Sequence, residues 1–166
     1  GVKAITVHGR TRQQFYKGEA RWNLVRPVVD AVDVPVVVNG DITSIGAARE
    51  ALQQSGAAAV MIGRGAQGQP WAVGQIGAQL AGREPQPAPA GGALAELVAG
   101  HYDAMLTDYG TQLGVRVARK HLDWYLEAAG MVLDKPVRSQ LLNELEPATV
   151  SRMIADIYSG DWRLAA

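Results

Sequence analysis

The chain has 166 residues, with 16 basic and 16 acidic side chains and no cysteine. The lack of cysteine excludes a disulfide scaffold and a zinc finger, and the zero net charge excludes a broadly basic nucleic-acid clamp but not a local basic patch. No run reaches the ~20 apolar residues of a membrane span, so we expect no membrane association and a cytoplasmic location. The chain starts at Gly1 in an apolar run and its first methionine is Met61, which predicts a piece of a longer polypeptide.

Residues 1–82 repeat one pattern three times: a β-branched run, a polar loop and a segment of helical period. The runs cover residues 2–7, 34–38 and 58–62. Because they are nearly continuous Val, Ile and Ala, they predict parallel strands covered on both faces. The helical segments cover about 20–32, 43–55 and 69–81. This pattern predicts an α/β fold, and its period fits both an eightfold barrel and a doubly wound sheet.

Residues 83–92 place prolines at alternate positions, which predicts an extended linker. Residues 93–166 are expected to be all-α, with short connections and a small helical bundle. The expected helices cover about 93–109, 115–126, 136–145 and a last segment from Pro147. In the first of them, His101 lies on an apolar stripe with Tyr109, so a buried structural role is its simplest interpretation.

Two glycine-containing loops follow the second and third expected strands. Asn39-Gly40-Asp41 precedes a helix whose N-cap is Thr43 or Ser44, and Gly63-Arg64-Gly65 precedes another helix. Such loops bring backbone amides close to an anion, and an arginine adds a forked donor for phosphate. Each loop alone could be a simple tight turn, but two on adjacent units favour a phosphate site. The G-x-G-x-x-G spacing within 63–68 does not indicate a Rossmann fold, because a proline-rich segment follows where that fold needs a second strand.

Two further groups carry charge. His8 ends the first strand, followed by Arg10 and Arg12, which suit a phosphate or polyanion, although such arginines also pair with carboxylates. The second half has one dense basic cluster, Arg116 with Arg119, Lys120 and His121. A self-paired, solvated face with an Arg119–Asp123 pair is the simpler interpretation of that cluster, and Trp124 and Tyr125 are expected in the core.

Four segments together resemble bacterial tRNA-dihydrouridine synthases, most of all the B-type subfamily. They are AITVHGRTR (4–12), VPVVVNGDI (34–42), VMIGRGAQGQPW (60–71) and VRVARKHLDWYL (115–126). The resemblance implies that residues 1–82 are the last three βα units of a TIM (β/α)8 barrel that binds FMN. It further implies a linker at 83–92 and a helical RNA-binding domain at 93–166, with no metal site.

The resemblance also assigns residues. The implied FMN contacts are His8, Asn39, Gly40, Asp41, Gly63 and Arg64. The implied tRNA contacts are Arg10, Arg12, Arg116, Arg119 and Lys120. Its reaction reduces the uridine C5=C6 bond: NADPH reduces FMN, the flavin passes hydride to C6, and a cysteine protonates C5. This chain has no cysteine, so no catalytic residue is assigned in it, and we expect it to be inactive alone.

Two other functions remain open from the residues: a helical RNA- or protein-binding module with residual barrel strands, and another FMN-dependent barrel oxidoreductase such as a dihydroorotate dehydrogenase. The partners expected from the resemblance are tRNA and the missing N-terminal half of the barrel. Three parallel strands cannot close a barrel, so their open face and edges also predict self-association of this chain.

Overall fold

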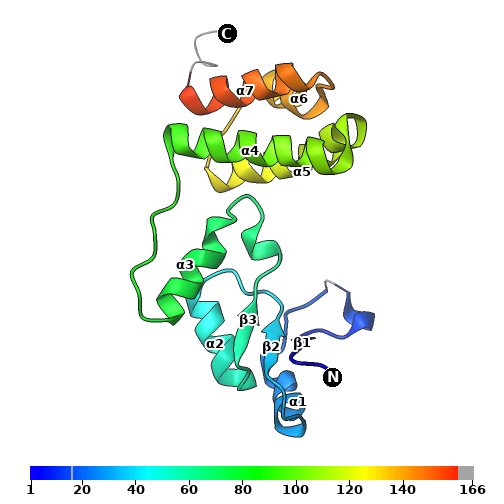
Figure 1. The fold of residues 1–166 in the computed structure, drawn as a ribbon, viewed down its shortest axis with the longest axis vertical. Helices are drawn as coiled ribbons and strands as arrows, with labels where there is room; N and C mark the ends of the chain where they lie inside the picture. Colours follow the sequence, from blue (N-terminus) through cyan, green and yellow to red (C-terminus); the bar gives the residue numbers. More distant parts are fainter. Residues whose placement is uncertain (16, 161–166) are drawn as a thin grey trace. The chain divides into compact units, whose positions relative to one another are not determined.

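The computed structural model describes residues 1–15 and 17–160, in two compact units, Gly1–Pro87 and Ala88–Ala166 (Figure 1). The division falls within the proline-rich segment. That segment ends earlier than expected, because Gly91 and Gly92 already belong to the first helix of the second unit. The alternating prolines stop at Pro89, so the residues that follow have the backbone N–H groups that a helix requires.

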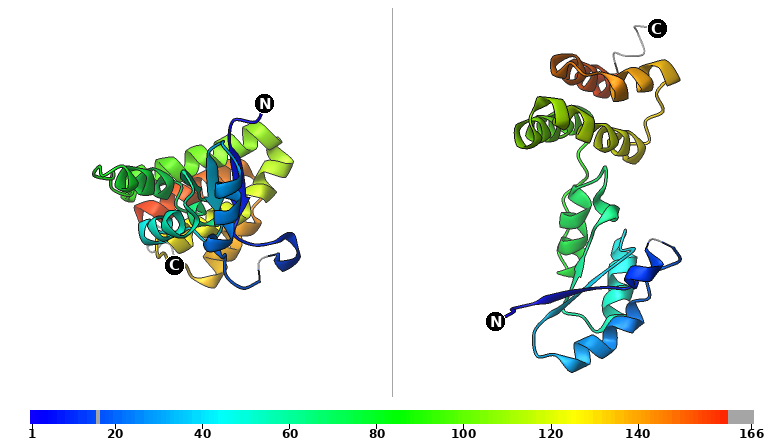
Figure 2. Two further views of the ribbon diagram at one scale, coloured as in Figure 1. Left: turned by 90° about the horizontal axis from the view of Figure 1, so that it is seen from below. Right: turned by 90° about the vertical axis from the view of Figure 1, so that its right-hand side faces the viewer.

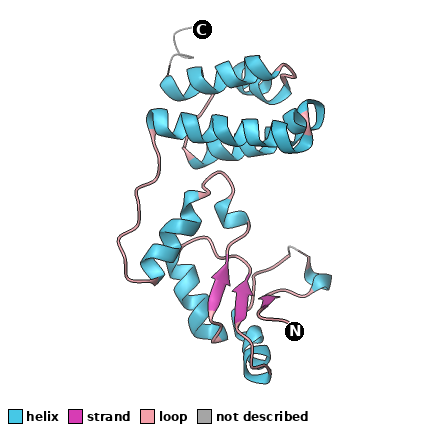
Figure 3. Ribbon diagram, viewed as in Figure 1, coloured by secondary structure: helices cyan, strands magenta, loops and turns pink. Residues whose placement is uncertain are grey.

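The first unit contains a parallel sheet with the order β1-β2-β3 (Figure 3). Its elements in chain order are β1 (Ile5–His8), the 3-10 turns η1 (Arg12–Gln14) and η2 (Trp22–Val25), α1 (Arg26–Ala31), β2 (Val36–Asn39), α2 (Ile45–Ser55), β3 (Ala59–Met61), η3 (Arg64–Ala66) and α3 (Trp71–Leu80). The α/β pattern and the three strands are therefore confirmed, each strand being shorter than its apolar run.

The helical segments of this unit agree with the sequence pattern in two cases of three. Ser44 caps α2 by accepting a hydrogen bond from the Ala47 N–H at 3.1 Å, and Gly56 ends the helix at φ 69°. The segment expected at 20–32 instead divides into η2 and α1. Pro27 explains the division, since it has no N–H to donate to residue 23.

The sheet is covered on one face, whereas the strand pattern indicates strands covered on both; an open face is what we expect of three strands that cannot close a barrel. Val36 and Val38 of β2 are buried in a core formed with η2, α2 and α3. The core residues are Val25, Val36, Val38, Ile42, Ala48, Ala51 and Ile76. On the opposite face Thr6, Ala59 and Met61 are exposed.

The described part of the second unit is helical, with α4 (Gly91–Tyr109), α5 (Thr111–Ala128), α6 (Lys135–Asn143) and α7 (Pro147–Ser159). Helix α4 packs beside α5 and also contacts α7 (Figure 2). The stripe expected on α5 is confirmed. Its members Val115, Ala118, Leu122, Tyr125 and Leu126 are all buried.

The burial of His101 and Tyr109 on helix α4 differs from the expectation. Tyr102 is 1% exposed, whereas His101 is only half-buried and Tyr109 is 50% exposed. The reason is that α4 packs against two helices, so its buried stripe is centred toward Tyr102. Within residues 1–15 and 17–160, no helix has the length and apolar character needed to cross a bilayer.

Candidate functional site at the strand ends

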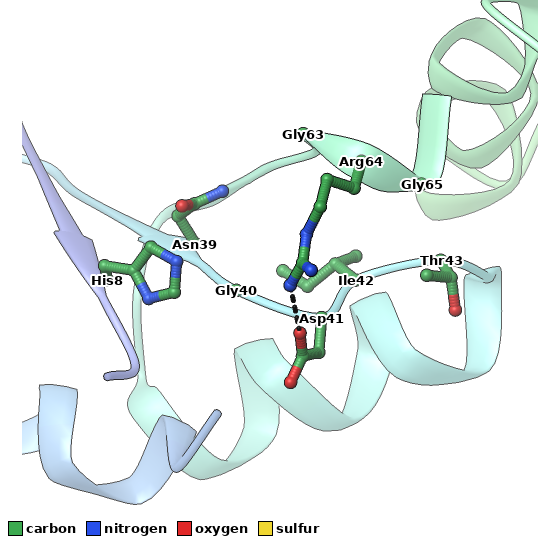
Figure 4. Close-up of a pocket in the computed structure, with 9 residues that line it drawn as sticks. All are labelled: His8, Asn39, Gly40, Asp41, Ile42, Thr43, Gly63, Arg64 and Gly65. Atoms are coloured by element: carbon green, nitrogen blue, oxygen red, sulfur yellow. Dashed lines mark hydrogen bonds and ion pairs between the residues drawn. The ribbon is translucent and has the colours of Figure 1, made fainter. Parts of the chain in front are cut away.

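A pocket of about 590 Å³ lies where the carboxyl ends of the three strands meet the loops that follow them (Figure 4). It is lined by His8, Asn39, Gly40, Asp41, Ile42, Thr43, Gly63, Arg64 and Gly65. All six residues that the resemblance assigns to cofactor binding are among them. Ligands of parallel α/β sheets bind at this end, outside the carboxyl ends of the strands.

The register of the sheet accounts for this convergence. His8 is opposite Asn39, and Asn39 is opposite Met61, so β1 and β2 end at the same level and the third loop starts beside them. The Asn39 side-chain amide donates to the Met61 carbonyl at 2.7 Å, and the Asn39 backbone carbonyl accepts from the Gly9 N–H at 2.8 Å. These bonds link the ends of the three strands to one another, one through the Asn39 side chain and one through the backbone.

The glycines of the two loops have different roles. A Cβ on Gly65 would lie 2.5 Å from the Ile42 carbonyl oxygen, and one on Gly40, at φ 121°, would lie 2.8 Å from the Ala20 Cβ. These two glycines are required by close packing between loops. A Cβ on Gly63 would meet no protein atom within 4 Å, although this glycine lines the pocket. The space next to Gly63 is thus available to a ligand.

Asp41 is the electrostatic centre of the pocket. Its carboxylate accepts hydrogen bonds from both terminal nitrogens of Arg10, one of them at 2.9 Å, and from the Ala20 N–H at 2.9 Å. Arg64 also reaches it, with an N···O distance of 3.3 Å, which is drawn in Figure 4. One carboxylate and two guanidiniums leave an excess of one positive charge, which suits an anionic ligand.

The same contacts set the ionisation of Asp41. Hydrogen bonding from Arg10 lowers the pKa of the Asp41 carboxyl below its usual range, and burial, the next largest effect, opposes it. The Ala20 N–H and the charges of Arg10 and Arg64 lower this pKa further. The carboxylate therefore stays charged at neutral pH and continues to orient both arginines. Asp41 also has φ 53°, a left-handed conformation that aspartate tolerates better than most residues.

His8 faces the pocket with a defined tautomer. The Arg10 backbone N–H donates to His8 Nδ1 at 3.1 Å, so Nδ1 acts as the acceptor and the ring proton of the neutral form is on Nε2. His8 is exposed and lines the pocket. Its Nε2–H is thus suited to donate a hydrogen bond to a ligand oxygen.

The structure separates the two arginines that the resemblance assigned to tRNA at this site. Only 4% of the Arg10 side chain is exposed, and it is held by Asp41 and by the Gly18 carbonyl at 2.6 Å. This geometry disagrees with direct contact between Arg10 and RNA, and it matches the pairing with a carboxylate that the sequence left open. Arg12 lies in η1 and is exposed.

The residues of the basic cluster on α5 also differ in exposure. Arg116 and Lys120 are exposed, one helical turn apart, whereas Arg119 is half-buried and its Nε has no hydrogen-bond partner among the described residues. The Arg119–Asp123 pair is not formed. Asp123 instead accepts hydrogen bonds from Arg138 of α6, with its Oδ1 2.5 Å and 2.8 Å from two guanidinium nitrogens. A partner on another helix could not be foreseen from the spacing along α5.

Sequence reasoning missed three pocket residues and one support. Ile42 and Thr43 carry no chemical signature, and Gly65 was seen only as part of its loop. Trp22 donates its indole N–H to the Gly40 carbonyl at 2.7 Å and so fixes the second loop from outside the pocket. No spacing rule links residue 22 to residue 40, although a tryptophan next to a strand-end loop is a usable signal.

Known proteins are similar to this chain over the segments described above. Residues 1–153 match the family model described as dihydrouridine synthase (Dus). The chain belongs to the dihydrouridine synthase family. It is 50% identical over 159 residues to a probable tRNA-dihydrouridine synthase of Rhodobacter capsulatus, covering 96% of this chain and 48% of the relative.

Two further relatives show the range of similarity. A probable tRNA-dihydrouridine synthase of Rickettsia prowazekii is 43% identical over 95% of this chain and 48% of its own length. A tRNA-dihydrouridine synthase B of Xanthomonas axonopodis is 46% identical over 75% of this chain and 38% of its own length. The resemblance drawn from the sequence is confirmed. The chain spans about half the length of the curated relatives that it matches.

Proposed function

We propose that this chain is the C-terminal half of an FMN-dependent tRNA-dihydrouridine synthase, a cytoplasmic enzyme that uses NADPH to reduce uridine to 5,6-dihydrouridine in tRNA. Residues 1–82 would supply the last three βα units of its TIM barrel, and the missing N-terminal half would be their partner. The observation that carries the proposal is the convergence of His8, Asn39, Gly40, Asp41, Gly63 and Arg64 on one pocket. Family membership favours this activity over the helical-module and dihydroorotate dehydrogenase alternatives.

The pocket fits the phosphate of a flavin mononucleotide in charge and in space. Arg64 reaches over the pocket and is oriented by Asp41, whose charge Arg10 compensates. The open space beside Gly63 lets an oxygen approach the backbone where a side chain would otherwise stand. Barrels of this class bind phosphate on the loops after strands 7 and 8, the positions that β2 and β3 would occupy.

The remaining residues of the pocket would position the ring system of FMN. FMN, when bound, supplies the hydride that reduces the uracil double bond. His8 would donate its Nε2–H to a carbonyl or phosphate oxygen, since Nδ1 is engaged by the Arg10 N–H. Asn39 would hold the loops in register, and Arg10 would act as a positioning residue through Asp41.

The proton that completes uracil reduction must come from elsewhere. The chain has no cysteine, and the residues described at the pocket include no replacement thiol. We therefore expect the chain alone to leave uridine unreduced. On the RNA side, Arg12, Arg116 and Lys120 are exposed and suited to phosphate contacts, while Arg119 is the weakest candidate because it is half-buried.

The test uses the longer polypeptide with the length of the relatives. We expect it to purify yellow, to be reduced by NADPH, and to form dihydrouridine in tRNA. Arg64→Met should weaken FMN binding about tenfold or more and leave riboflavin binding unchanged, because riboflavin lacks the phosphate that Arg64 would bind. Fluorescence titration of the apoprotein with the two flavins measures both affinities.

Two glycine variants supply the control. Gly63→Ala should fold with unchanged thermal stability and lose FMN affinity, because its Cβ would enter ligand space. Gly65→Ala should destabilise the fold, because its Cβ would collide with the Ile42 carbonyl. A colourless full-length protein, or an Arg64→Met variant that weakens both flavins equally, would reject the proposal.

A further inference from the structure

A second pocket, of about 350 Å³, lies between α4 and α5 in the helical unit. Helix α4 contributes His101, Met105, Asp108 and Tyr109, and α5 contributes Val117 and His121. The lining combines the apolar side chains of a methionine and a valine with a polar group of two imidazoles and a carboxylate, called here the polar edge. The flavin pocket lies in the other unit, so this second pocket requires a separate explanation.

The polar edge is rigid. The His101 Nδ1 lies 3.0 Å from the Tyr125 hydroxyl, and the His101 and His121 rings meet edge to face with centroids 5.2 Å apart. The His121 ring in turn meets Trp124 edge to face, with centroids 5.0 Å apart. Because these contacts fix both imidazoles, the pocket offers donors and acceptors at set positions.

The ionisation of His121 favours a neutral ring. Burial lowers its pKa, and the neighbouring His101 and Lys120 lower it further. A neutral imidazole presents one donor and one acceptor, the combination that matches the edge of a heterocyclic base. Tyr109, 50% exposed, adds an aromatic side chain to the lining.

An acidic side chain lines the pocket, whereas basic side chains lie outside it. Asp108 lines the pocket and would repel a phosphate there, but it can accept hydrogen bonds from an exocyclic amine. Outside the pocket, Arg116 and Lys120 are exposed on α5, and Lys120 Nζ lies 5.6 Å from the Trp124 ring centroid. Asp123, which could have neutralised them, is engaged by Arg138. The part of a ligand that enters the pocket should therefore be uncharged, and the part that remains outside it should be anionic.

We propose that the α4–α5 pocket receives one unstacked nucleobase of RNA, while Arg116 and Lys120 contact the adjoining phosphates. The proposal rests on the proposed function, which makes RNA the substrate. A base displaced from its stack needs a planar apolar slot with hydrogen-bonding groups on its rim, and stacking on side chains contributes a large part of single-strand affinity. Free nucleotides carry the same base chemistry and are a separate arm of the test.

The test fills the pocket from its solvent side. Ala104 lines the pocket and is exposed, so Ala104→Trp should occupy the pocket without disturbing the core. Ala155→Trp is the matched control, because Ala155 is an exposed alanine inside α7. The probes are a fluorescein-labelled RNA hairpin with an unpaired loop and the same hairpin with an abasic loop, titrated against the 166-residue chain by fluorescence anisotropy.

We expect the chain to bind the loop hairpin about tenfold more tightly than the abasic one, and Ala104→Trp to abolish that difference. Ala155→Trp should keep it. Lys120→Ala should weaken both hairpins and flatten the salt dependence, because it removes a phosphate contact. Tyr109→Ala, a substitution at an exposed position, should reduce the preference for the loop hairpin if Ala104→Trp fails to fold.

Equal affinity for the two hairpins, or an unchanged preference in both pocket variants, would overturn the proposal, as would the absence of binding to either. If free adenosine monophosphate competes at concentrations well below those at which the RNA binds, the ligand of the pocket is a free nucleotide. That result would also overturn the proposal. Flavin binding by the longer polypeptide depends on the first unit, so it reports on the proposed function independently of this pocket.

Discussion

The two units hold their functional residues in different ways. In the first unit, contacts between the loops that follow three strands order the pocket, as shown by the close approach of Gly65 to the Ile42 carbonyl and by the hydrogen bond from the Asn39 side chain to the Met61 carbonyl. In the second unit, the proposed pocket is ordered by side chains packed between two helices. The first unit also exposes one sheet face, whereas α4 of the second is packed against helices on two sides. The sheet unit should therefore depend on further protein, and the helical unit should hold its own core.

The largest effect expected is a core truncation in the helical unit. Ile154 is 1% exposed in α7, and Ile154→Ala should lower the free energy of unfolding of this unit by about 2–5 kcal/mol. If the two units unfold independently, calorimetry will show one transition moving to lower temperature and the other unchanged. Arg152→Ala, an exposed change on the same helix, is the control. Equal shifts in both transitions would contradict the independence of the helical core.

The next effect concerns the exposed face of the sheet. We expect the chain to self-associate through this face and through the edges of β1 and β3. Met61 is 50% exposed on this face, and Met61→Glu should raise the dissociation constant at least about tenfold, because a charge would be buried in the contact. Light scattering over a concentration series measures the change.

The control for this prediction is Val73→Glu on α3, where the valine is 48% exposed. It adds the same charge at matched exposure on the other side of the unit and should leave association unchanged. A wild-type chain that is monomeric at all concentrations with an intact sheet would refute self-association.

The smallest effect is a dependence on alkaline pH in the helical unit. Burial raises the pKa of Tyr158 to about 12, and its hydroxyl is buried with no hydrogen-bond partner among the described residues. A raised pKa means that the folded state favours the neutral phenol. Its contribution to stability is complete below about pH 10, the pKa of an unfolded tyrosine, and is lost as pH rises from about 10 to 12.

Tyr158→Phe should thus be nearly neutral at pH 7 and should retain more stability than the wild type between pH 10 and 12, measured by thermal denaturation. The loss will be reduced and not abolished, because burial also raises the pKa of Tyr102 and Tyr125. Tyr109→Phe, at an exposed position, is the matched control. Identical alkaline profiles for wild type and Tyr158→Phe would contradict this origin of the sensitivity.

Local signals in the sequence were sufficient for most elements and for six of the nine residues that line the first pocket. Ser44 and Gly56 marked the ends of α2, and three glycine or histidine loops after successive strands had to meet at one end of a parallel sheet. The family resemblance then agreed with the same loops. These features depend on residues close in the chain, or on the general geometry of parallel strands.

The features that were wrong or missed depend on contacts between distant residues. The resemblance assigned Arg10 to RNA, and the sequence could not identify its partner Asp41, which is 31 positions away. Asp123 was paired within its own helix, whereas its partner Arg138 lies on the next one. The buried stripe of α4 shifted toward Tyr102 because two helices, and not one, cover it. No periodicity contains this information.

The contrast between Gly63 and Gly65 determines how genetic tolerance at these two positions should be understood. A saturation library selected only for a folded chain would lose variants at Gly65, where any side chain meets the Ile42 carbonyl, and would retain alanine at Gly63. Under the proposed function, a library of the longer polypeptide selected for FMN binding would lose both. Depletion of variants at Gly65 would thus result from packing within the fold. Depletion at Gly63 would appear only under the second selection and would result from loss of ligand binding.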